Sequence, residues 1–204
     1  MRADLTVVAR MVPPGARVLD LGCGDGDLLA ELIGARGCRG QGVEVSPEAF
    51  HACLMRGIPV VQADIDAGLP VFEDGAFDVV VLSQTLQATR RPTLVLREMM
   101  RVGRVGVVSF PNFGHWRARL QLGLRGRMPV SRALPYPWYD TPNIHLCTLR
   151  DFEELARAEG LVVEERRLLA DDGTAASPRR GPPPHPRAPG PGPPPPRQPG
   201  GAPP

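Results

Sequence analysis

The sequence of 204 residues contains no lysine, and none of its apolar runs reaches the roughly 18 residues that a membrane-spanning helix needs. Its opening segment breaks at Pro13 and Pro14 and is too short and too polar for a signal peptide. The formal net charge is +2, but four arginines and no acids follow Asp172, which leaves −2 for the preceding part. Because that part lacks a basic field, we expect neither nucleic acid nor a membrane as a partner.

Cysteine is also scarce, and its spacing contains no CxxC or other metal-binding motif. The four cysteines are Cys23, Cys38, Cys53 and Cys147. Their scatter is typical of a protein in a reducing compartment. We therefore expect a cytoplasmic location and no metal site.

The motifs of acyl-transfer catalysis are missing as well. No G-x-S-x-G nucleophile elbow is present, and no histidine has a recognisable nucleophile partner in the sequence. The four histidines are His51, His115, His145 and His185. If the protein serves acyl transfer, the nucleophile belongs to another chain.

Proline, by contrast, is concentrated at the end of the chain, where 14 of the 25 prolines lie between Pro178 and Pro204. A segment with so little to bury cannot offset its ordering entropy, so we predict a disordered or polyproline II tail over residues 171–204. Residues 1–170 then form one domain. Two explanations of the tail stay open: a frame-shifted or mispredicted end, or a genuine ligand for an SH3-like partner.

Five short apolar runs predict the strands of a parallel sheet that is covered on both faces, because they are continuous rather than alternating. The runs are Val18–Leu21, Gly42–Val45, Pro59–Gln62, Phe77–Leu82 and Val105–Phe110. Helices are predicted between several of them, over Asp27–Arg36, Pro47–Arg56 and Pro92–Val102, whereas 64–76 is too turn-rich for one. This alternation predicts an α/β fold with a doubly wound, mostly parallel, Rossmann-like sheet.

The rhythm changes after Phe110. Residues 111–147 form a long irregular insert, which follows the fifth strand and is therefore predicted to lie over the rim of the pocket. One basic helix is predicted within it, over His115–Gly123. A helix over Leu149–Glu159 follows, and Thr148 and Asp151 occupy the positions of a capping box at its start. The last apolar segment, Leu161–Leu169, is predicted to be a strand.

The strongest functional signal is the stretch DLGCGDGD, which starts at Asp20. Acidic or hydrogen-bonding residues also end the next three predicted strands, at Glu44, Asp64 and the Ser83-Gln84 pair. Because ligands of open α/β sheets bind beyond the carboxyl ends of the strands, these residues predict a nucleoside pocket, in which Glu44 can accept hydrogen bonds from ribose hydroxyls. Glycines that serve packing alone and a solvated Glu44 are the alternative.

The spacing and charge of this stretch distinguish between nucleosides. Dinucleotide folds use G-x-G-x-x-G and place a pyrophosphate at a helix N-terminus. Here the spacing is G-x-G-x-G, with Asp20 before it and Asp25 inside it. These acids oppose a diphosphate and favour a cationic ligand such as an amino-bearing sulfonium, so a nicotinamide cofactor is the weaker alternative.

The phrases VLDLGCGDGDLL, GVEVSP, ADID and FDVVVLSQTLQ closely resemble class I S-adenosylmethionine-dependent methyltransferases from Ala16 to Phe110. The resemblance implies that the sheet ends in an antiparallel hairpin with Leu161–Leu169 as one arm. It also implies that Ser83 and Gln84 lie beside the sulfonium, Glu44 at the ribose and Asp64 at the adenine edge. The methionine part would be held by Asp20, Gly22, Gly24 and Gly26.

Three further phrases, LSQTLQATRRP, VSFPNFGHWRARLQLGLRGRMPVS and LPYPWYDTPNIHLCTLRDFE, are similar to the methionine biosynthesis protein W (MetW) family. This resemblance implies a methyltransferase-like accessory protein of methionine biosynthesis. It would bind S-adenosylmethionine or S-adenosylhomocysteine and act as partner or activator of a MetX-type homoserine O-acyltransferase. An active methyltransferase for a small molecule is the alternative, so the chain's own enzymatic status stays open.

The insert is rich in arginine and aromatic residues, which are favoured anchors at protein interfaces. We interpret it as a docking surface for the acyltransferase or as a lid; a structural flap and a membrane-touching helix are the alternatives. The candidate partner-binding residues are Trp116, Arg117, Arg119, Arg125, Trp138 and Tyr139. His145 is a candidate acid or base on the acceptor side, with a purely structural hydrogen-bonding role as the alternative.

Overall fold

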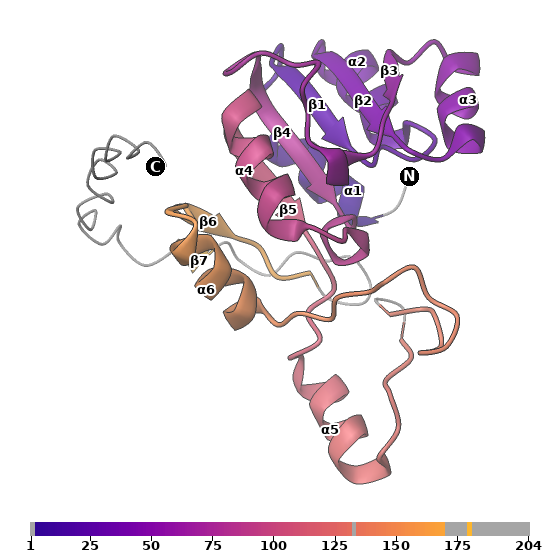
Figure 1. Ribbon diagram of the computed structural model, residues 1–204, viewed down its shortest axis with the longest axis vertical. Helices are drawn as coiled ribbons and strands as arrows, with labels where there is room; N and C mark the ends of the chain where they lie inside the picture. Colours follow the sequence, from indigo (N-terminus) through magenta and orange to yellow (C-terminus); the bar gives the residue numbers. More distant parts are fainter. Residues whose placement is uncertain (1–2, 132–133, 170–178, 181–204) are drawn as a thin grey trace, which may run out of the picture.

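A five-stranded parallel sheet forms the centre of the protein in a computed structural model that describes residues 3–131, 134–169 and 179–180 (Figure 1). The strand order is β3-β2-β1-β4-β5, which confirms the doubly wound α/β prediction. The strands are β1 (Arg17–Leu21), β2 (Arg39–Glu44), β3 (Val60–Gln62), β4 (Phe77–Ser83) and β5 (Gly103–Ser109). The main error in the predicted runs is at β2, which begins three residues earlier and ends before the exposed Val45.

Both faces of the sheet are covered, as the continuous apolar runs predict. On one face, α1 (Ala3–Met11) and α2 (Asp27–Arg36) pack against Val18, Val79 and Val81. On the other face, α4 (Pro92–Val102) packs against Leu19, Leu21, Val80 and Leu82. Each apolar side chain buried in this way stabilises the fold by about 1.5–3 kcal/mol relative to an exposed one.

Local sequence signals set the helix boundaries. Helix α3 (Pro47–Met55) begins where Ser46 Oγ accepts a hydrogen bond from the Ala49 N–H, and Pro47 occupies its first turn. The predicted bounds of α2 and α4 are confirmed. Helix α1 was not predicted from the sequence. Leu5, Val8 and Val12 nevertheless have the spacing of an amphipathic helix, and all three are buried.

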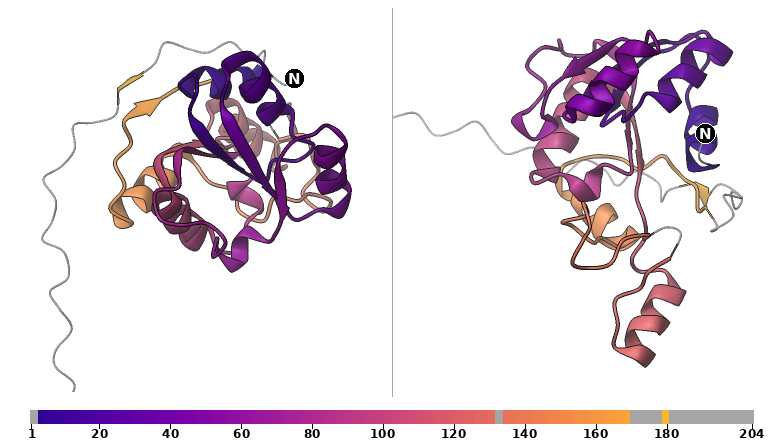
Figure 2. Two further views of the ribbon diagram at one scale, coloured as in Figure 1. Left: turned by 90° about the horizontal axis from the view of Figure 1, so that it is seen from above. Right: turned by 90° about the vertical axis from the view of Figure 1, so that its right-hand side faces the viewer.

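The turn-rich segment after β3 contains a short 3₁₀ helix, η1 (Ile65–Ala67), and a second one, η2 (Leu86–Ala88), follows β4. The insert leaves β5 and forms α5 (Trp116–Arg125), which projects away from the sheet (Figures 1 and 2). Gly123 does not end this helix; Gly126, with φ 59°, is its C-cap.

The region after the insert confirms one prediction and corrects another. Helix α6 (Leu149–Ala158) begins with the predicted capping box of Thr148 and Asp151. The predicted strand over Leu161–Leu169 is wrong for most of its length, because within it only β6 (Glu165–Arg166) is a strand, and Leu169 forms an isolated bridge. Val162 and Leu168 are exposed at 59% and 47%, so the segment lacks the burial that would hold it in the sheet.

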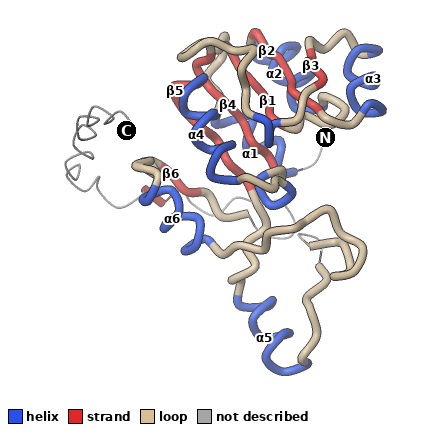
Figure 3. The backbone as a smooth tube through the Cα atoms, in the orientation of Figure 1, coloured by secondary structure: helices blue, strands red, loops and turns tan. Residues whose placement is uncertain are grey.

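Strand β6 pairs antiparallel with β7 (Arg179–Arg180), and this pair is separate from the main sheet (Figure 3). Within the described residues, no further strand therefore extends the sheet beyond β5. The prediction of a tail without structure does not hold for Arg179 and Arg180. The rest of the predicted tail, 171–178 and 181–204, lies outside the described residues.

Candidate functional site

The glycine-rich turn follows β1 directly. It lies where the carboxyl ends of the parallel strands meet, which we call the carboxyl-end edge of the sheet. Gly22, Gly24 and Gly26 have φ angles of 72°, 57° and 80°, in the left-handed region that favours glycine. The N–H groups of Gly22 and Cys23 both donate to the Val43 carbonyl, at 2.8 and 3.2 Å. The turn therefore folds across the end of β2 and lies against the residues that follow it.

The three glycines have different surroundings. A Cβ at Gly22 would lie 2.6 Å from Thr85 Cγ2, and one at Gly26 would lie 3.1 Å from Cys53 Sγ. At Gly24 a Cβ would meet nothing within 4 Å. Gly22 and Gly26 thus permit close packing within the protein, whereas Gly24 faces open space, where another molecule can approach the backbone.

Glu44 connects the glycine-rich turn to the end of β2. Its Oε2 accepts a hydrogen bond from the Gly24 N–H at 2.8 Å, and its Oε1 accepts from the N–H groups of Val45 and Ser46, both at 2.9 Å. The Glu44 residue is only 9% exposed. A carboxylate has about four acceptor positions; one here holds the turn at Gly24, and two hold the chain just after β2.

Asp20 and Glu44 place two buried acidic side chains at this edge. Asp20, in β1, is 3% exposed. Burial raises the pKa of the Cys23 thiol, and the charges of Asp20, Cys53 and Glu44 raise that pKa further. Burial and the neighbouring acids therefore both act on Cys23 inside the turn.

Asp25, the second acid of the turn, acts on Cys53: burial raises the pKa of that thiol, and the charge of Asp25 raises it further. Asp25 is exposed, and its carboxylate lies 3.6 Å from the guanidinium of Arg56 at the end of α3. The same guanidinium pairs with Asp27 at 2.9 Å. Asp20 and Glu44 are therefore the buried acids at this edge, and Asp25 is an exposed one.

The ends of β3 and β4 supply the remaining predicted residues. Asp64 is exposed, and its Oδ1 accepts a hydrogen bond from the Asp66 N–H at 2.9 Å, which caps η1. Ser83 Oγ lies 3.0 Å from Ser109 Oγ at the end of β5. The parallel order of the strands brings these ends to the same edge as the glycine-rich turn.

Gln84 is the only residue other than glycine with a positive φ in the described chain, at 53°. Its backbone is held by bonds from its N–H to the Ser109 carbonyl and from Gln87 Nε2 to its own carbonyl, both 2.8 Å. Its side chain donates to Asp4 of α1 at 2.8 Å. Such strain, about 1–3 kcal/mol, persists where the surrounding structure fixes it and clusters at functional sites.

Two residues next to Gln84 were not recognised in the sequence. Asp4 brings the start of α1 to the carboxyl-end edge, and Gln87, which is 6% exposed, receives the N–H groups of Ile144 and His145 on its carbonyl at 2.9 and 3.0 Å. His145 is thereby placed beside η2 through its main chain, while its side chain is exposed. Neither residue carries a sequence motif, because both contacts join distant segments.

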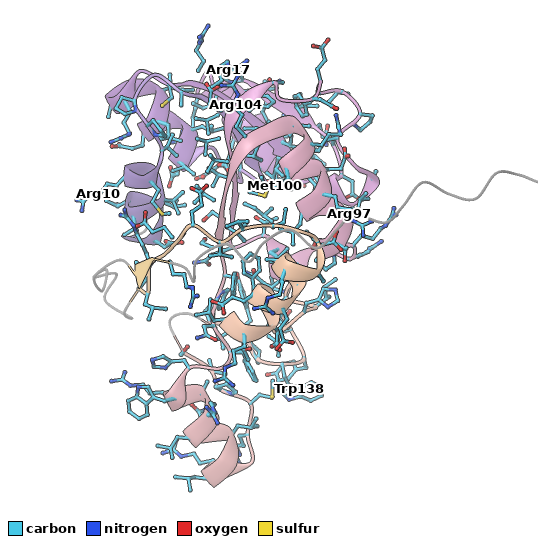
Figure 4. The ribbon with its side chains drawn as sticks, turned by 90° about the vertical axis from the view of Figure 1, so that its left-hand side faces the viewer. Arg10, Arg17, Arg97, Met100, Arg104 and Trp138 are labelled. Atoms are coloured by element: carbon cyan, nitrogen blue, oxygen red, sulfur yellow. The ribbon has the colours of Figure 1, made fainter. Side chains whose placement is uncertain are left out.

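The candidate partner-binding residues do not form one cluster with the glycine-rich turn. Arg117, Arg119 and Arg125 lie with Trp116 on α5, and Trp138 lies on the loop beyond it, to one side of the helix (Figure 4). Trp116, Trp138 and Tyr139 are 61%, 73% and 75% exposed. The rings of Trp138 and Tyr139 contact each other, with centroids 5.8 Å apart.

Three other features bear on the kind of site: metal ligands, membrane spans and surface hollows. Among the described residues, no group of three or more His, Cys, Asp or Glu side chains could hold a metal ion, and no helix is long and apolar enough to cross a membrane. A shallow hollow of about 460 Å³ lies along α2 and is lined by Asp27, Ala30, Glu31, Gly34, Ala35 and Arg56. Because it lies on the outer surface of the helix, we assign it no role in the site.

The sheet order, the glycine-rich turn and the acid at the end of β2 define a protein with the class I methyltransferase-like fold. A solved structure of the same fold is the S-adenosylmethionine-dependent methyltransferase, possible histamine N-methyltransferase, of Thermotoga maritima. It matches with a TM-score of 0.61 and 18% identity, over 88% of this chain and 82% of its own. A likeness at this level of identity concerns the fold alone.

The chain belongs to the MetW family of methionine biosynthesis proteins. The profile described as "Methionine biosynthesis protein MetW" matches residues 2–182. A bifunctional methionine biosynthesis protein MetXA/MetW of Rhodopirellula baltica is 37% identical over 174 residues, which are 81% of this chain and 28% of that protein. A ubiquinone biosynthesis O-methyltransferase of Xanthomonas oryzae pv. oryzae is 30% identical over 63% of this chain and 56% of its own. The chain thus spans between a quarter and three fifths of these relatives.

Proposed function

We propose that the protein binds S-adenosylmethionine or S-adenosylhomocysteine at the carboxyl-end edge. The residues that would hold the ligand are Asp20, Gly22, Gly24, Gly26, Glu44, Asp64, Ser83 and Gln84. Bound as the sulfonium form, the ligand would supply an electrophilic methyl group. The family membership and the structural neighbours support this ligand class.

The geometry fits this ligand in three respects. The open space at Gly24 allows a nucleoside to approach the backbone of the turn. Glu44 keeps one acceptor position for a ribose hydroxyl, since three are filled by main-chain N–H groups. The carboxyl group of the buried Asp20 would, when ionised, complement an ammonium or a sulfonium.

We further propose that the protein is an accessory subunit or activator of a MetX-type homoserine O-acyltransferase. The observation that carries this proposal is the R. baltica relative, in which MetXA and MetW form one polypeptide. The chain itself contains no G-x-S-x-G motif, so the acyl-transfer nucleophile would come from the partner. A ligand derived from the pathway product could report methionine status, provided that its affinity differs between two states of the complex.

Co-expression with the homoserine O-acyltransferase of the same organism tests the partnership. We expect both proteins to elute together from a sizing column and the acyl-transfer rate to rise when the MetW-family chain is added. The assay is run with and without S-adenosylmethionine, and calorimetry measures that ligand's affinity for the chain alone. Separate elution at micromolar concentrations, with an unchanged rate, would refute the partnership.

An active small-molecule methyltransferase is the second candidate, and the O-methyltransferase relative is the observation that favours it. Positioning a donor and an acceptor can suffice for methyl transfer and leaves little trace in a sequence. His145 would be a weak candidate for an acid or base on the acceptor side. Incubation with methyl-labelled donor and a metabolite extract tests this: a labelled product would establish it, and calorimetry with NAD in parallel tests the dinucleotide alternative.

A further inference from the structure

Helix α5 has an apolar stripe that the rest of the described chain leaves uncovered. Trp116, Leu120 and Leu124 are spaced by four residues and are 61%, 51% and 77% exposed. At roughly 100° per residue they fall within a sector of about 80° and extend along about 12 Å of the helix. No residue of α5 is buried.

The two sides of α5 differ in exposure. Ala118 and Gln121 are half-buried on one side, whereas the stripe residues are all exposed. Leu122 lies about 200° around the helix from Leu120 and is 40% exposed. The helix thus presents its apolar stripe outward, and it projects away from the sheet in Figure 1 and in the right-hand view of Figure 2.

Arginine borders the stripe on both sides. Viewed around the helix axis, Arg119 lies on one side of the stripe and Arg117 on the other. The Arg117 guanidinium lies 5.3 Å from the centre of the Trp116 ring. The sequence contains no acidic residue between Glu98 and Asp140. Two copies of α5 paired through their stripes would therefore bring like charges together, which disfavours self-association by this helix.

We infer that α5 is a docking helix whose stripe binds an apolar groove with an acidic border on the homoserine O-acyltransferase. The inference rests on the proposed partnership and names the surface that makes it. Apolar anchors at i, i+4 and i+8 are typical of a helix bound in a groove. The fused R. baltica relative supports this partner, because its two parts are joined covalently.

Matched substitutions on the two sides of α5 test the inference. Leu120→Glu and Leu124→Glu place a carboxylate in the stripe, and Leu122→Glu makes the same change on the other side of the helix. Because all three positions are exposed, the fold should tolerate each change. We expect the first two to raise the Kd for purified homoserine O-acyltransferase by about 30-fold or more, and Leu122→Glu to change it by less than about threefold.

The possible results separate this inference from the proposed function. If the unchanged chain binds the enzyme and all three variants bind equally, α5 is not the docking helix, although the partnership stands. If the unchanged chain does not bind the enzyme, the partnership itself fails. Equal weakening by all three variants would also refute a stripe-specific contact.

Three parallel measurements exclude other occupants of the stripe. Sedimentation with anionic phosphatidylglycerol vesicles tests a membrane surface, and light scattering tests self-association. Calorimetry with S-adenosylmethionine tests a lid. If the stripe variants alter any of these readouts while enzyme binding is unchanged, the docking assignment is overturned.

Discussion

Replacing Glu44 by glutamine tests the centre of the site most directly. The three N–H groups around this carboxylate come from Gly24, Val45 and Ser46, at 2.8 to 2.9 Å. Glutamine has one carbonyl oxygen, which can serve the pair at Val45 and Ser46. Its NH₂ group then faces the Gly24 N–H, so two donors meet where a charge-assisted hydrogen bond existed.

The expected cost follows from these contacts. An unsatisfied buried donor costs about 1–3 kcal/mol, and a hydrogen bond to a charged group contributes about 1.5–3 kcal/mol. Because Glu44 is only 9% exposed, water can compensate little. We therefore expect Glu44→Gln to lower the free energy of unfolding by about 2 kcal/mol, which corresponds to about 4–8 °C in Tm for a domain of this size.

Ligand affinity is the second readout. The glycine-rich turn loses its fixed orientation and the ribose loses an acceptor, so we expect the Kd for S-adenosylmethionine to rise about tenfold or more. Thermal unfolding without ligand and calorimetry on the folded variant measure the two effects separately. Glu48→Gln is the control, because Glu48 is exposed on α3 and its Oε2 accepts a hydrogen bond from the Ser46 hydroxyl at 2.7 Å.

Two outcomes would refute this reasoning. An unchanged Tm would mean that the bonds from Gly24, Val45 and Ser46 contribute no stability. An unchanged affinity in a folded sample would mean that Glu44 lies outside the ligand site.

Four other predictions concern the glycine-rich turn, the ion pair of Glu98 with Arg101, the cap of α6 and the thiols. Gly22→Ala and Gly24→Ala share the left-handed strain of about 1–2 kcal/mol, but only the first adds a clash, at 2.6 Å from Thr85, so its urea midpoint should fall further; equal midpoints would contradict the close packing. The Arg101 guanidinium lowers the pKa of Glu98 from 4.5 to about 2, so the stability that this carboxylate contributes is present above pH 4.5 and is lost as the pH falls toward 2. Glu98→Gln should remove that part of the pH dependence in urea titrations, and an identical pH profile would argue against it. Thr148→Ala removes the capping box of α6 and should cost about 1 kcal/mol in chemical unfolding, whereas no loss would mean that the cap is dispensable. Iodoacetamide should modify the half-buried Cys147 before the fully buried Cys53, as read by peptide mass spectrometry; the reverse order would indicate that α3 opens readily.

The sequence predicted the sheet well because its strands are buried on both faces. Their residues are continuous and apolar, so all five strands were recognised, with errors of one to three residues at their ends. The helix caps were predicted equally well, because the side chains of Ser46 and Thr148 accept hydrogen bonds from N–H groups only three residues away. Leu161–Leu169 misled the prediction, because an apolar composition does not decide whether a segment finds a sheet edge to pair with.

Within the site, the residues of the glycine-rich turn and Glu44 were identified, whereas their internal contacts were not. The sequence gives no reason why Asp25 should pair with Arg56, or why Gly24 rather than Gly22 should face open space. These differences depend on how α3 and the β4 end pack against the turn. Likewise, the bond between Gln84 and Asp4 joins residues 80 positions apart, so no local pattern contains it.

The sequence by itself determined the doubly wound sheet, the glycine-rich turn and the family, because each depends on spacing within a short segment. Only the tertiary structure decided that Glu44 orients the turn at Gly24 and that α5 presents Trp116, Leu120 and Leu124 outward. The physical reason is that burial and hydrogen bonding between distant segments are fixed by packing. An apolar stripe on a helix looks the same in a sequence whether it lies in a core or on a surface.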